Sequence, residues 1–351
     1  MPKEDRLQII REIEKLRGSR VVTYLTADRG FASVPVAEDI VRIIFRHLQS
    51  IAQSPKLDLF LYSRGGDTMV PWPLVSAVRQ HTKEFNVLVP YRAHSAATQI
   101  ALGADHIVMG PVAELTQVDP SIRTEYTPTN PLNPQPGQNL LLSVEDLRAY
   151  FEFLKDIVGL PKEQVRIELE LLKEKVHPIA IGQVHRTAAS IEYITKSLLK
   201  THIKNEDEVK KLAKAIVTGL HVHSHKINRK EAEGLGLPAV DATPQEADLM
   251  WKLYERYEED MQLEKPIRPS NVFPNNTAAF VELKDQKMVY VESTHRSDVY
   301  LMSLLAARAA AQQVGMAYPT GLPVPQPAQP TRTIWGPQVA FAIEGESWST
   351  E

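Results

Sequence analysis

A serine at the start of an expected helix, Ser95, is the first candidate for chemistry. It follows an apolar run at 86–90 and opens a short apolar segment at 95–103. The free amides and the dipole at a helix N-terminus favour a developing negative charge. Ser95 in that position can supply a nucleophile, and the backbone N–H of Ala96 an oxyanion donor. The alternative is that Ser95 only caps the helix.

A diglycine, Gly65-Gly66, follows another apolar run at 57–62. Without side chains, its backbone N–H groups can approach a ligand oxygen and form part of an oxyanion hole, although a tight turn is the commoner role of Gly-Gly. The diglycine and Ser95 follow consecutive strands of one expected parallel sheet. Both are therefore predicted at the carboxyl edge of that sheet, where ligands bind.

An aspartate and three histidines are further candidates. Asp119 precedes a proline, which holds it extended and can aim its carboxylate, or it serves a turn. His221, His223 and His225 alternate, so on a strand their imidazoles share one face. Three interpretations of these histidines remain open: they form a zinc site, one of them lies beside Ser95 as a catalytic base, or they form an ordinary polar edge.

Two lysines are alternative candidates for the base of a Ser–Lys pair, which needs a lysine whose pKa burial has lowered. Lys155 and Lys196 lie near apolar helix faces, where a surface role is the simpler interpretation. The chain has no cysteine, which excludes a thiolate nucleophile and a disulfide framework. It also has no Gly-x-x-x-x-Gly-Lys-Ser/Thr loop for a nucleotide. No metal and no other cofactor is expected.

The composition is that of a globular protein: 43% of the 351 residues are hydrophobic and 24% are charged. The net charge of −3 gives no strong field toward nucleic acid or an anionic membrane. No basic start leads into an apolar signal region, and no apolar run is long enough to span a bilayer. We expect no nucleic-acid partner, no membrane span and a cytoplasmic location.

Strand and helix patterns alternate in the first third of the chain, which predicts an α/β fold with a largely parallel sheet. Strands are expected at 20–26, 57–62, 86–90 and 106–109, and helices at 38–52, 71–82 and 95–103. Farther along, the sequence predicts helices over 144–219 with a break near 177–178, a β-hairpin at 278–292, an Ala-rich helix at 299–313 and a Pro-rich arm. The expected division is a domain at 1–245, a helix and hairpin extension at 246–317 and an arm at 318–351.

The order of these segments resembles the serine dehydrogenase proteinase family, which is related to Clp-type and signal peptide peptidase A-type proteases. The resemblance spans roughly residues 5–245, and its most specific part is the block at 89–110. The shorter matching segments are 21–29, 62–66, 118–120 and 223–238.

The resemblance implies a Clp/crotonase-like superhelix of strand–strand–helix units and assembly into a homo-oligomer. It also implies roles for named residues: Ser95 as nucleophile, His223 as base, Asp119 orienting the imidazole, and the amides of Gly66 and Ala96 binding the oxyanion. Two positions depart from the family pattern, in which a glycine stands at Ala97 and a proline at Arg64.

The leading hypothesis is a serine endopeptidase that cleaves peptides or unfolded proteins through an acyl-enzyme on Ser95. One alternative is a catalytically inactive scaffold that keeps the fold and its oligomer surface. Another is a crotonase-type enzyme that uses the same oxyanion hole on an acyl-thioester. A lone serine nucleophile favours the peptidase over the crotonase-type lyase, because those enzymes more often use carboxylates.

Overall fold

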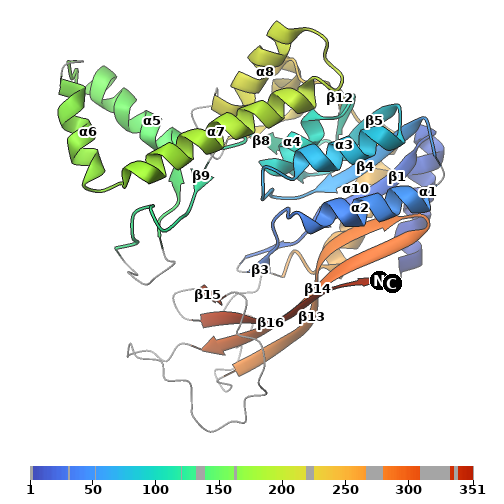
Figure 1. The fold of residues 1–351 in the computed structure, drawn as a ribbon. Coiled ribbons are helices and arrows are strands. Elements are labelled where there is room, and N and C mark those ends of the chain that lie inside the picture. Colours follow the sequence, from blue (N-terminus) through green and yellow to red (C-terminus); the bar gives the residue numbers. More distant parts are fainter. Residues whose placement is uncertain are drawn as a thin grey trace.

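The computed structural model describes most of the chain. Its described residues are 3–30, 32–51, 53–119, 121–131, 139–161, 164–218, 225–265, 280–308, 333–335 and 339–350. A large mixed sheet with helices on both faces forms the body of the molecule (Figure 1). No helix in these ranges is long and apolar enough to cross a membrane.

Five parallel strands form one half of the large sheet, as the alternating pattern predicts. Their order is β12-β7-β5-β4-β1, and each pairs in parallel with its neighbour. The strands are β1 (Arg20–Thr26), β4 (Lys56–Tyr62), β5 (Glu84–Val89), β7 (His106–Met109) and β12 (Ala239–Asp241). The four strands expected in the first third of the chain are thus confirmed.

Helices cover both faces of this half because successive strand side chains point to opposite sides. Leu61 packs into the core under α2, α3 and α4, whereas its neighbour Phe60 packs into the core under α1 and α10. The helices are α1 (Lys3–Arg17), α2 (Asp39–Ser50), α3 (Pro71–His81), α4 (Ala96–Leu102) and α10 (Pro244–Asp260). The expected helices at 38–52, 71–82 and 95–103 are confirmed.

A separate three-stranded sheet lies beyond the carboxyl edge of the parallel strands. Its order is β11-β8-β6, with β8 parallel to β6 and antiparallel to β11. The strands are β6 (Arg92–Ala93), β8 (Glu114–Thr116) and β11 (Lys226–Ile227). This small sheet brings segments far apart in sequence to the start of α4.

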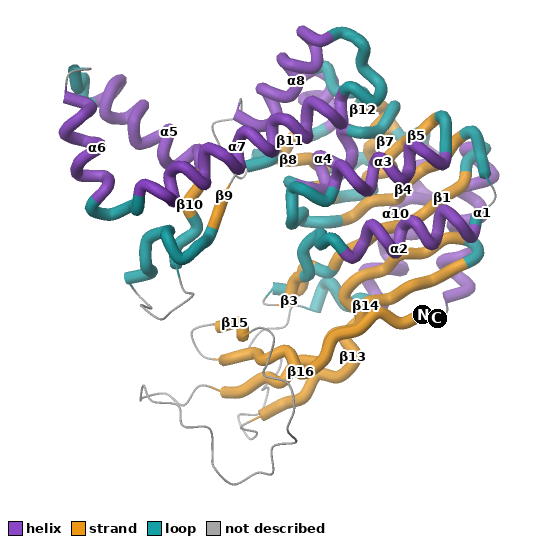
Figure 2. Tube along the Cα trace, viewed as in Figure 1, coloured by secondary structure: helices purple, strands orange, loops and turns teal. Residues whose placement is uncertain are grey.

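A helical arm projects from the body at α7 (Figure 2). One end of α7 packs on α4 and α8, and the other carries α5, β9 and a small separate hydrophobic core. The break near 177–178 is confirmed, because His177 caps α7 with Pro178 at its first position. The elements are β9 (Ser121–Ile122), β10 (Leu142–Ser143), α5 (Val144–Glu152), the π-helix η1 (Phe153–Ile157), α6 (Val165–Lys173), α7 (Pro178–Leu199), α8 (Glu206–Thr218) and α9 (Arg229–Leu235).

The C-terminal part corrects two predictions. The expected hairpin at 278–292 is one long strand, and the expected Ala-rich helix at 299–313 is a strand as far as Arg308. These strands, β13 (Phe280–Ser293) and β14 (Arg296–Arg308), form a hairpin that pairs with β16 (Val339–Thr350) and extends the sheet from β1. β15 (Thr333–Trp335) ends the sheet. Pairing on both sides of β14 outweighs the helix propensity of its alanines.

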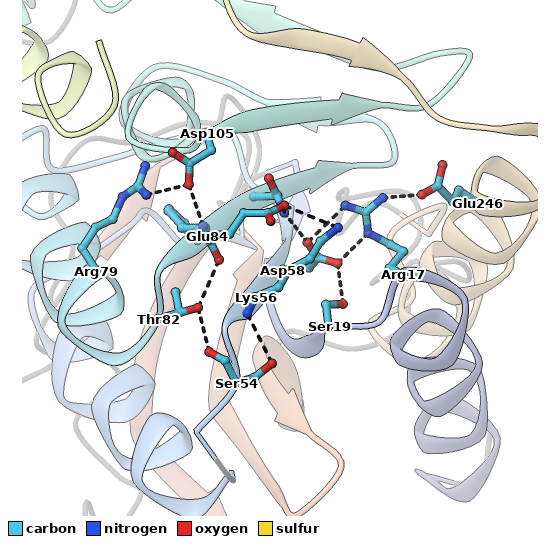
Figure 3. Close-up of polar contacts among 12 residues, drawn as sticks. Arg17, Ser19, Ser54, Lys56, Asp58, Arg79, Thr82, Glu84, Asp105 and Glu246 are labelled. Atoms are coloured by element: carbon cyan, nitrogen blue, oxygen red, sulfur yellow. Dashed lines mark hydrogen bonds and ion pairs between the residues drawn. The ribbon is translucent and has the colours of Figure 1, made fainter. Parts of the chain in front are cut away.

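The opposite edge of the parallel strands carries a polar network (Figure 3). Arg17 lies 2.5 Å from Asp58 and also pairs with Glu246, and Asp58 accepts further hydrogen bonds from Ser19 and Asn86. Glu246 also forms a capping box with Thr243 at the start of α10. Every charge of this network has a partner within it, so we interpret the network as structural.

Candidate active site

Ser95 adopts a backbone conformation that few residues other than glycine adopt. Its φ is 51° and its ψ is −117°, at the sharp turn between β6 and α4. Such strain costs of order 1–3 kcal/mol and concentrates at functional sites. The Ser95 amide donates to the Thr116 hydroxyl at 2.9 Å, which fixes the turn to β8. The side chain makes no cap hydrogen bond, so the simple capping alternative does not account for Ser95.

The diglycine turn lies directly against Ser95. A Cβ added to Gly65 would lie 2.7 Å from the Ser95 Cβ and 2.5 Å from the His94 carbonyl oxygen. A Cβ added to Gly66 would lie 2.4 Å from the backbone nitrogen and oxygen of Val36. Both glycines also have positive φ, 91° and 156°. Only glycine satisfies both requirements at these positions.

Two backbone amides remain available beside Ser95. The Gly65 amide is occupied, because it donates to the Ser63 hydroxyl at 3.1 Å. The amides of Gly66 and Ala96 donate to no acceptor among the residues that the structure describes. Ala96 is the first residue of α4, where an N–H has no partner within the helix. These are the two amides that the family resemblance assigns to an oxyanion hole.

Ala97 and Arg64, the two residues that depart from the family pattern, lie in different surroundings. Ala97 is fully buried in the core under α4, so its methyl group does not face solvent. The Arg64 side chain is 57% exposed, and its Nε lies 3.6 Å from an Asp28 carboxylate oxygen. Asp28 already pairs with Arg92 at 3.0 Å.

A polar cluster around Glu114 lies next to Ser95, and no local sequence pattern indicates it. The Glu114 carboxylate lies 2.9 Å from His94 Nε2, 3.2 Å from Arg92 Nε and 3.9 Å from Lys226 Nζ. Burial, together with the charges of Lys226, Arg92 and Arg64, lowers the pKa of His94 to about 3. The His94–Glu114 contact is therefore a hydrogen bond of a neutral imidazole at neutral pH.

Lys226 enters this cluster through strand pairing. It lies opposite Thr116 in the small sheet, and Thr116 is the residue whose hydroxyl receives the Ser95 amide. Burial lowers the pKa of Lys226, and the charges of Arg64 and Arg92 lower it further against the opposing effect of Glu114. Lys226 and Ser95 are far apart in sequence, and no local pattern predicts the pairing of β11 with β8 that brings Lys226 close to the Ser95 turn.

Asp119 lies three residues after the end of β8, and both of its carboxylate oxygens are shielded from solvent. The residues before it are tied to the end of α8: the Val118 amide donates to the Ile216 carbonyl at 3.1 Å, and Gln117 donates to the Val217 carbonyl at 2.9 Å. On the other side, Lys226 pairs with Thr116. The two ends of the segment between Val217 and Lys226 are thus both anchored within three residues of Asp119.

The proposed base His223 lies within that segment and, like His221, outside the described residues. His225 is described, and its Nε2 lies 2.6 Å from Glu231 on α9. The two lysines weighed as bases pair elsewhere, Lys155 with Asp156 and Lys196 with Glu192. Within the described ranges, no three His, Cys, Asp or Glu side chains are grouped to hold a metal ion.

An apolar cavity of about 400 Å³ opens between α7 and the chain that leaves the diglycine. Met69 and Trp72 form one wall, at the start of α3, and Tyr193 and Ile194 of α7 form another. Met69 and Trp72 are 53% and 42% exposed. The cavity therefore offers an apolar surface three residues beyond Gly66.

The first part of the chain is similar to a family of ClpP-like serine proteinases. Residues 2–132 match the family model described as ClpP-like SDH-type serine proteinase. The matched segment contains Gly66, Ser95 and Asp119 but not His223. The family resemblance seen in the sequence is confirmed.

Two uncharacterized proteins of Methanocaldococcus jannaschii are similar over a longer stretch. One is 28% identical over 257 residues, which cover 72% of this chain and 79% of the relative. The other is 25% identical over 255 residues, 71% of this chain and 76% of the relative.

Two solved structures of the 1510-N membrane-bound stomatin-specific protease, both of mutants, also align with the chain. One, in complex with a substrate peptide, has 15% identity and a TM-score of 0.36, with 60% of this chain and 73% of that chain covered. The other has 14% identity and a TM-score of 0.36, with 59% and 75% covered.

Proposed function

We propose that the protein is a serine peptidase that cleaves peptide bonds through an acyl-enzyme on Ser95. The observation that carries the proposal is the contact between the strained Ser95 turn and the diglycine, with the Gly66 and Ala96 amides unused beside it. Donors fixed in place before charge develops are the main requirement of an oxyanion hole. The family match supports the same chemistry.

In the proposed reaction, Ser95 Oγ attacks the carbonyl carbon of the scissile bond while His223 takes its proton. Asp119 holds the imidazole in the required tautomer. The negative oxygen of the tetrahedral intermediate accepts hydrogen bonds from Gly66 and Ala96. The C–N bond then breaks, His223 returns the proton to the leaving amine, and water hydrolyses the acyl-enzyme by the same steps. The anchoring of the 217–226 segment beside Asp119 supports this assignment.

We base the proposed substrate class on the apolar cavity near the diglycine. The apolar wall formed by Met69 and Trp72 supports the proposal that the substrates are peptides or unfolded proteins with an apolar side chain near the scissile bond.

Assembly into a homo-oligomer and a cytoplasmic location remain predictions. Exposed apolar residues on the helical arm, including Phe153 and Ile157 at 52% and 76% exposure, support an oligomer contact there.

A fluorophosphonate probe, which acylates activated serines, tests the proposal. We expect wild type to be labelled and Ser95→Ala to be unlabelled, with peptidase activity reduced by roughly 10⁴-fold or more. Ser63→Ala is less suitable as a control because Ser63 positions the Gly65 amide. Ser50→Ala, at the end of α2 and away from the cavity beside the diglycine, is a better control and should be labelled like wild type. Equal labelling of wild type and Ser95→Ala rejects the nucleophile, and no labelling at all favours the inactive scaffold.

A further inference from the structure

A second cavity, of about 250 Å³, lies between the start of α2 and the C-terminal strands. The elements that enclose it, α2, β13, β14 and β16, lie together in Figure 1. One wall is formed by residues 33–35 and Ala37, and the intervening Val36 hydrogen-bonds Gly65 and Asp67. The lining residues are Tyr24, Ser33, Val34, Pro35, Ala37, Asp39, Ile40, Val289, Tyr300, Met302, Ile343, Glu346 and Trp348.

The lining combines aromatic rings with negative charge. Tyr300 and Trp348 pack together with ring centroids 5.4 Å apart. Trp348 Nε1 donates to an Asp39 carboxylate oxygen at 2.6 Å, and the Tyr300 hydroxyl donates to Glu346. Among the lining residues that the structure describes, none is a lysine, arginine or histidine, and the donors to the two carboxylates are the neutral groups of Trp348 and Tyr300. Aromatic faces and carboxylates without a cation of their own attract a cation.

Tyr24 gives a second, independent observation. It lines the cavity although it is only 1% exposed, and its hydroxyl makes no hydrogen bond to any residue in the described part of the chain. A hydroxyl without a partner in a largely buried site favours a ligand that hydrogen-bonds to it. Burial and the nearby Asp39 raise the pKa of Tyr24, so the hydroxyl stays neutral and can accept a hydrogen bond from an N–H group.

We infer that this cavity binds a primary alkylammonium ion. Its aliphatic chain contacts Val34, Ile40 and Met302, while the ammonium group pairs with Asp39 and Glu346 and donates to the Tyr24 hydroxyl. Such a group occurs on a lysine side chain of a peptide and on a free diamine. The site is separate from Ser95, so the inference holds whether or not the proposed peptidase activity does.

Isothermal titration calorimetry of the full chain with n-butylammonium tests the inference, with n-butanol as the neutral probe of similar shape. We expect butylammonium to bind and butanol to bind at least tenfold more weakly. Asp39→Asn and Glu346→Gln should each weaken butylammonium binding by roughly tenfold, since each removes a charge-assisted contact. Tyr24→Phe should weaken it by a smaller factor.

Glu38→Gln is the matched control, because Glu38 precedes Asp39 and does not line the cavity. It should bind butylammonium like wild type. The Ser95→Ala variant should also bind it unchanged, which separates this test from that of the peptidase. Binding of N-acetyl-lysine amide supports a peptide side chain as the source, and binding of 1,5-diaminopentane alone supports a free diamine. Equal binding of butylammonium and butanol, or equal losses in Glu38→Gln and Glu346→Gln, overturns the inference.

Discussion

Gly65 lies so close to Ser95 that a side chain on the glycine would bring the two Cβ atoms to 2.7 Å. Real Cβ atoms do not approach so closely, so Gly65→Ala must displace the diglycine, the Ser95 turn or both. Because oxyanion donors act only when they are held in place, we expect peptidase activity to fall by roughly 10²-fold or more. Steady-state peptide hydrolysis measures this loss, and fluorophosphonate labelling reports whether Ser95 is still activated.

Gly236→Ala is the control for backbone strain in that experiment. Gly236 has the same φ of 91°, but an added Cβ would meet only a Leu212 methyl group at 3.5 Å, an ordinary contact. Both variants should lose stability from strain of about 1–2 kcal/mol. Only Gly65→Ala should also lose activity at temperatures where both are folded. Equal activity in the two variants would show that the Gly65–Ser95 contact does not matter for catalysis.

The general base is tested by His223→Gln and Lys226→Met. With His223 as the base, His223→Gln should lower kcat by roughly 10³-fold or more, and Lys226→Met should change it only a few-fold. The wild-type kcat/KM should then rise with pH as the imidazole loses its proton. A pH–rate profile of each variant measures this.

His225→Gln is the matched control, because His225 already bonds to Glu231. It should keep near-wild-type kcat. Loss of activity in Lys226→Met with retention in His223→Gln would replace the proposed triad by a Ser–Lys pair. Burial lowers the pKa of Lys226, so the rising limb of the profile would then lie below the ordinary lysine pKa.

The apolar pattern predicted four of the five parallel strands, because β1, β4, β5 and β7 are almost continuously buried on both faces. The strand β14 was missed for the opposite reason. Residues 299–308 are compatible with a helix locally, and only pairing with β13 and β16 makes them a strand. Such pairing joins residues far apart in sequence, so no local pattern reveals it.

The candidate site likewise contains residues that the local sequence predicts and residues that only long-range contacts bring together. Ser95 and the diglycine were identified because each stands at the end of a recognisable strand. The cluster of Glu114 with His94 and Lys226 was missed, because it depends on the pairing of β11 with β8. The role of Asp119 rests on its neighbours' bonds to the end of α8, which are likewise long-range contacts.

Acid should destabilise the fold through His47, which is fully buried between Ser293 and Asp298 at 3.0 Å from each. Burial lowers the pKa of His47 to about 4, although Asp298 partly opposes the shift. The unfolded chain, with a pKa near 6.5, therefore binds more protons between pH 6.5 and 4. Stability is then lost as the pH falls through this window, by about 2 kcal/mol between pH 7 and pH 5 from this residue.

Urea unfolding at pH 7 and pH 5 measures this loss. His47→Gln should reduce the pH dependence by about the same 2 kcal/mol. His295→Gln, in the exposed turn of the same hairpin, should leave it unchanged. The buried His94 and His202, whose pKa values burial lowers to about 3 and about 4, should keep part of the dependence in both variants. An identical pH dependence in wild type and His47→Gln would contradict the assignment.

The C-terminal strands should be part of the same cooperative unit as the parallel sheet, because a buried ion pair joins them to α1. Arg6 contacts both carboxylate oxygens of Glu292 on β13 at 2.8 and 2.9 Å, and the two side chains are 1% and 0% exposed. Arg6→Met leaves a buried carboxylate without its cation, which should lower the free energy of unfolding by about 3 kcal/mol or more. Arg11→Met, which removes an exposed arginine from the same helix, should change it by less than about 0.5 kcal/mol. Urea denaturation followed by circular dichroism compares the two, and a single transition that shifts in Arg6→Met supports one unit. Similar midpoints for the two variants would mean that α1 and β13 unfold independently.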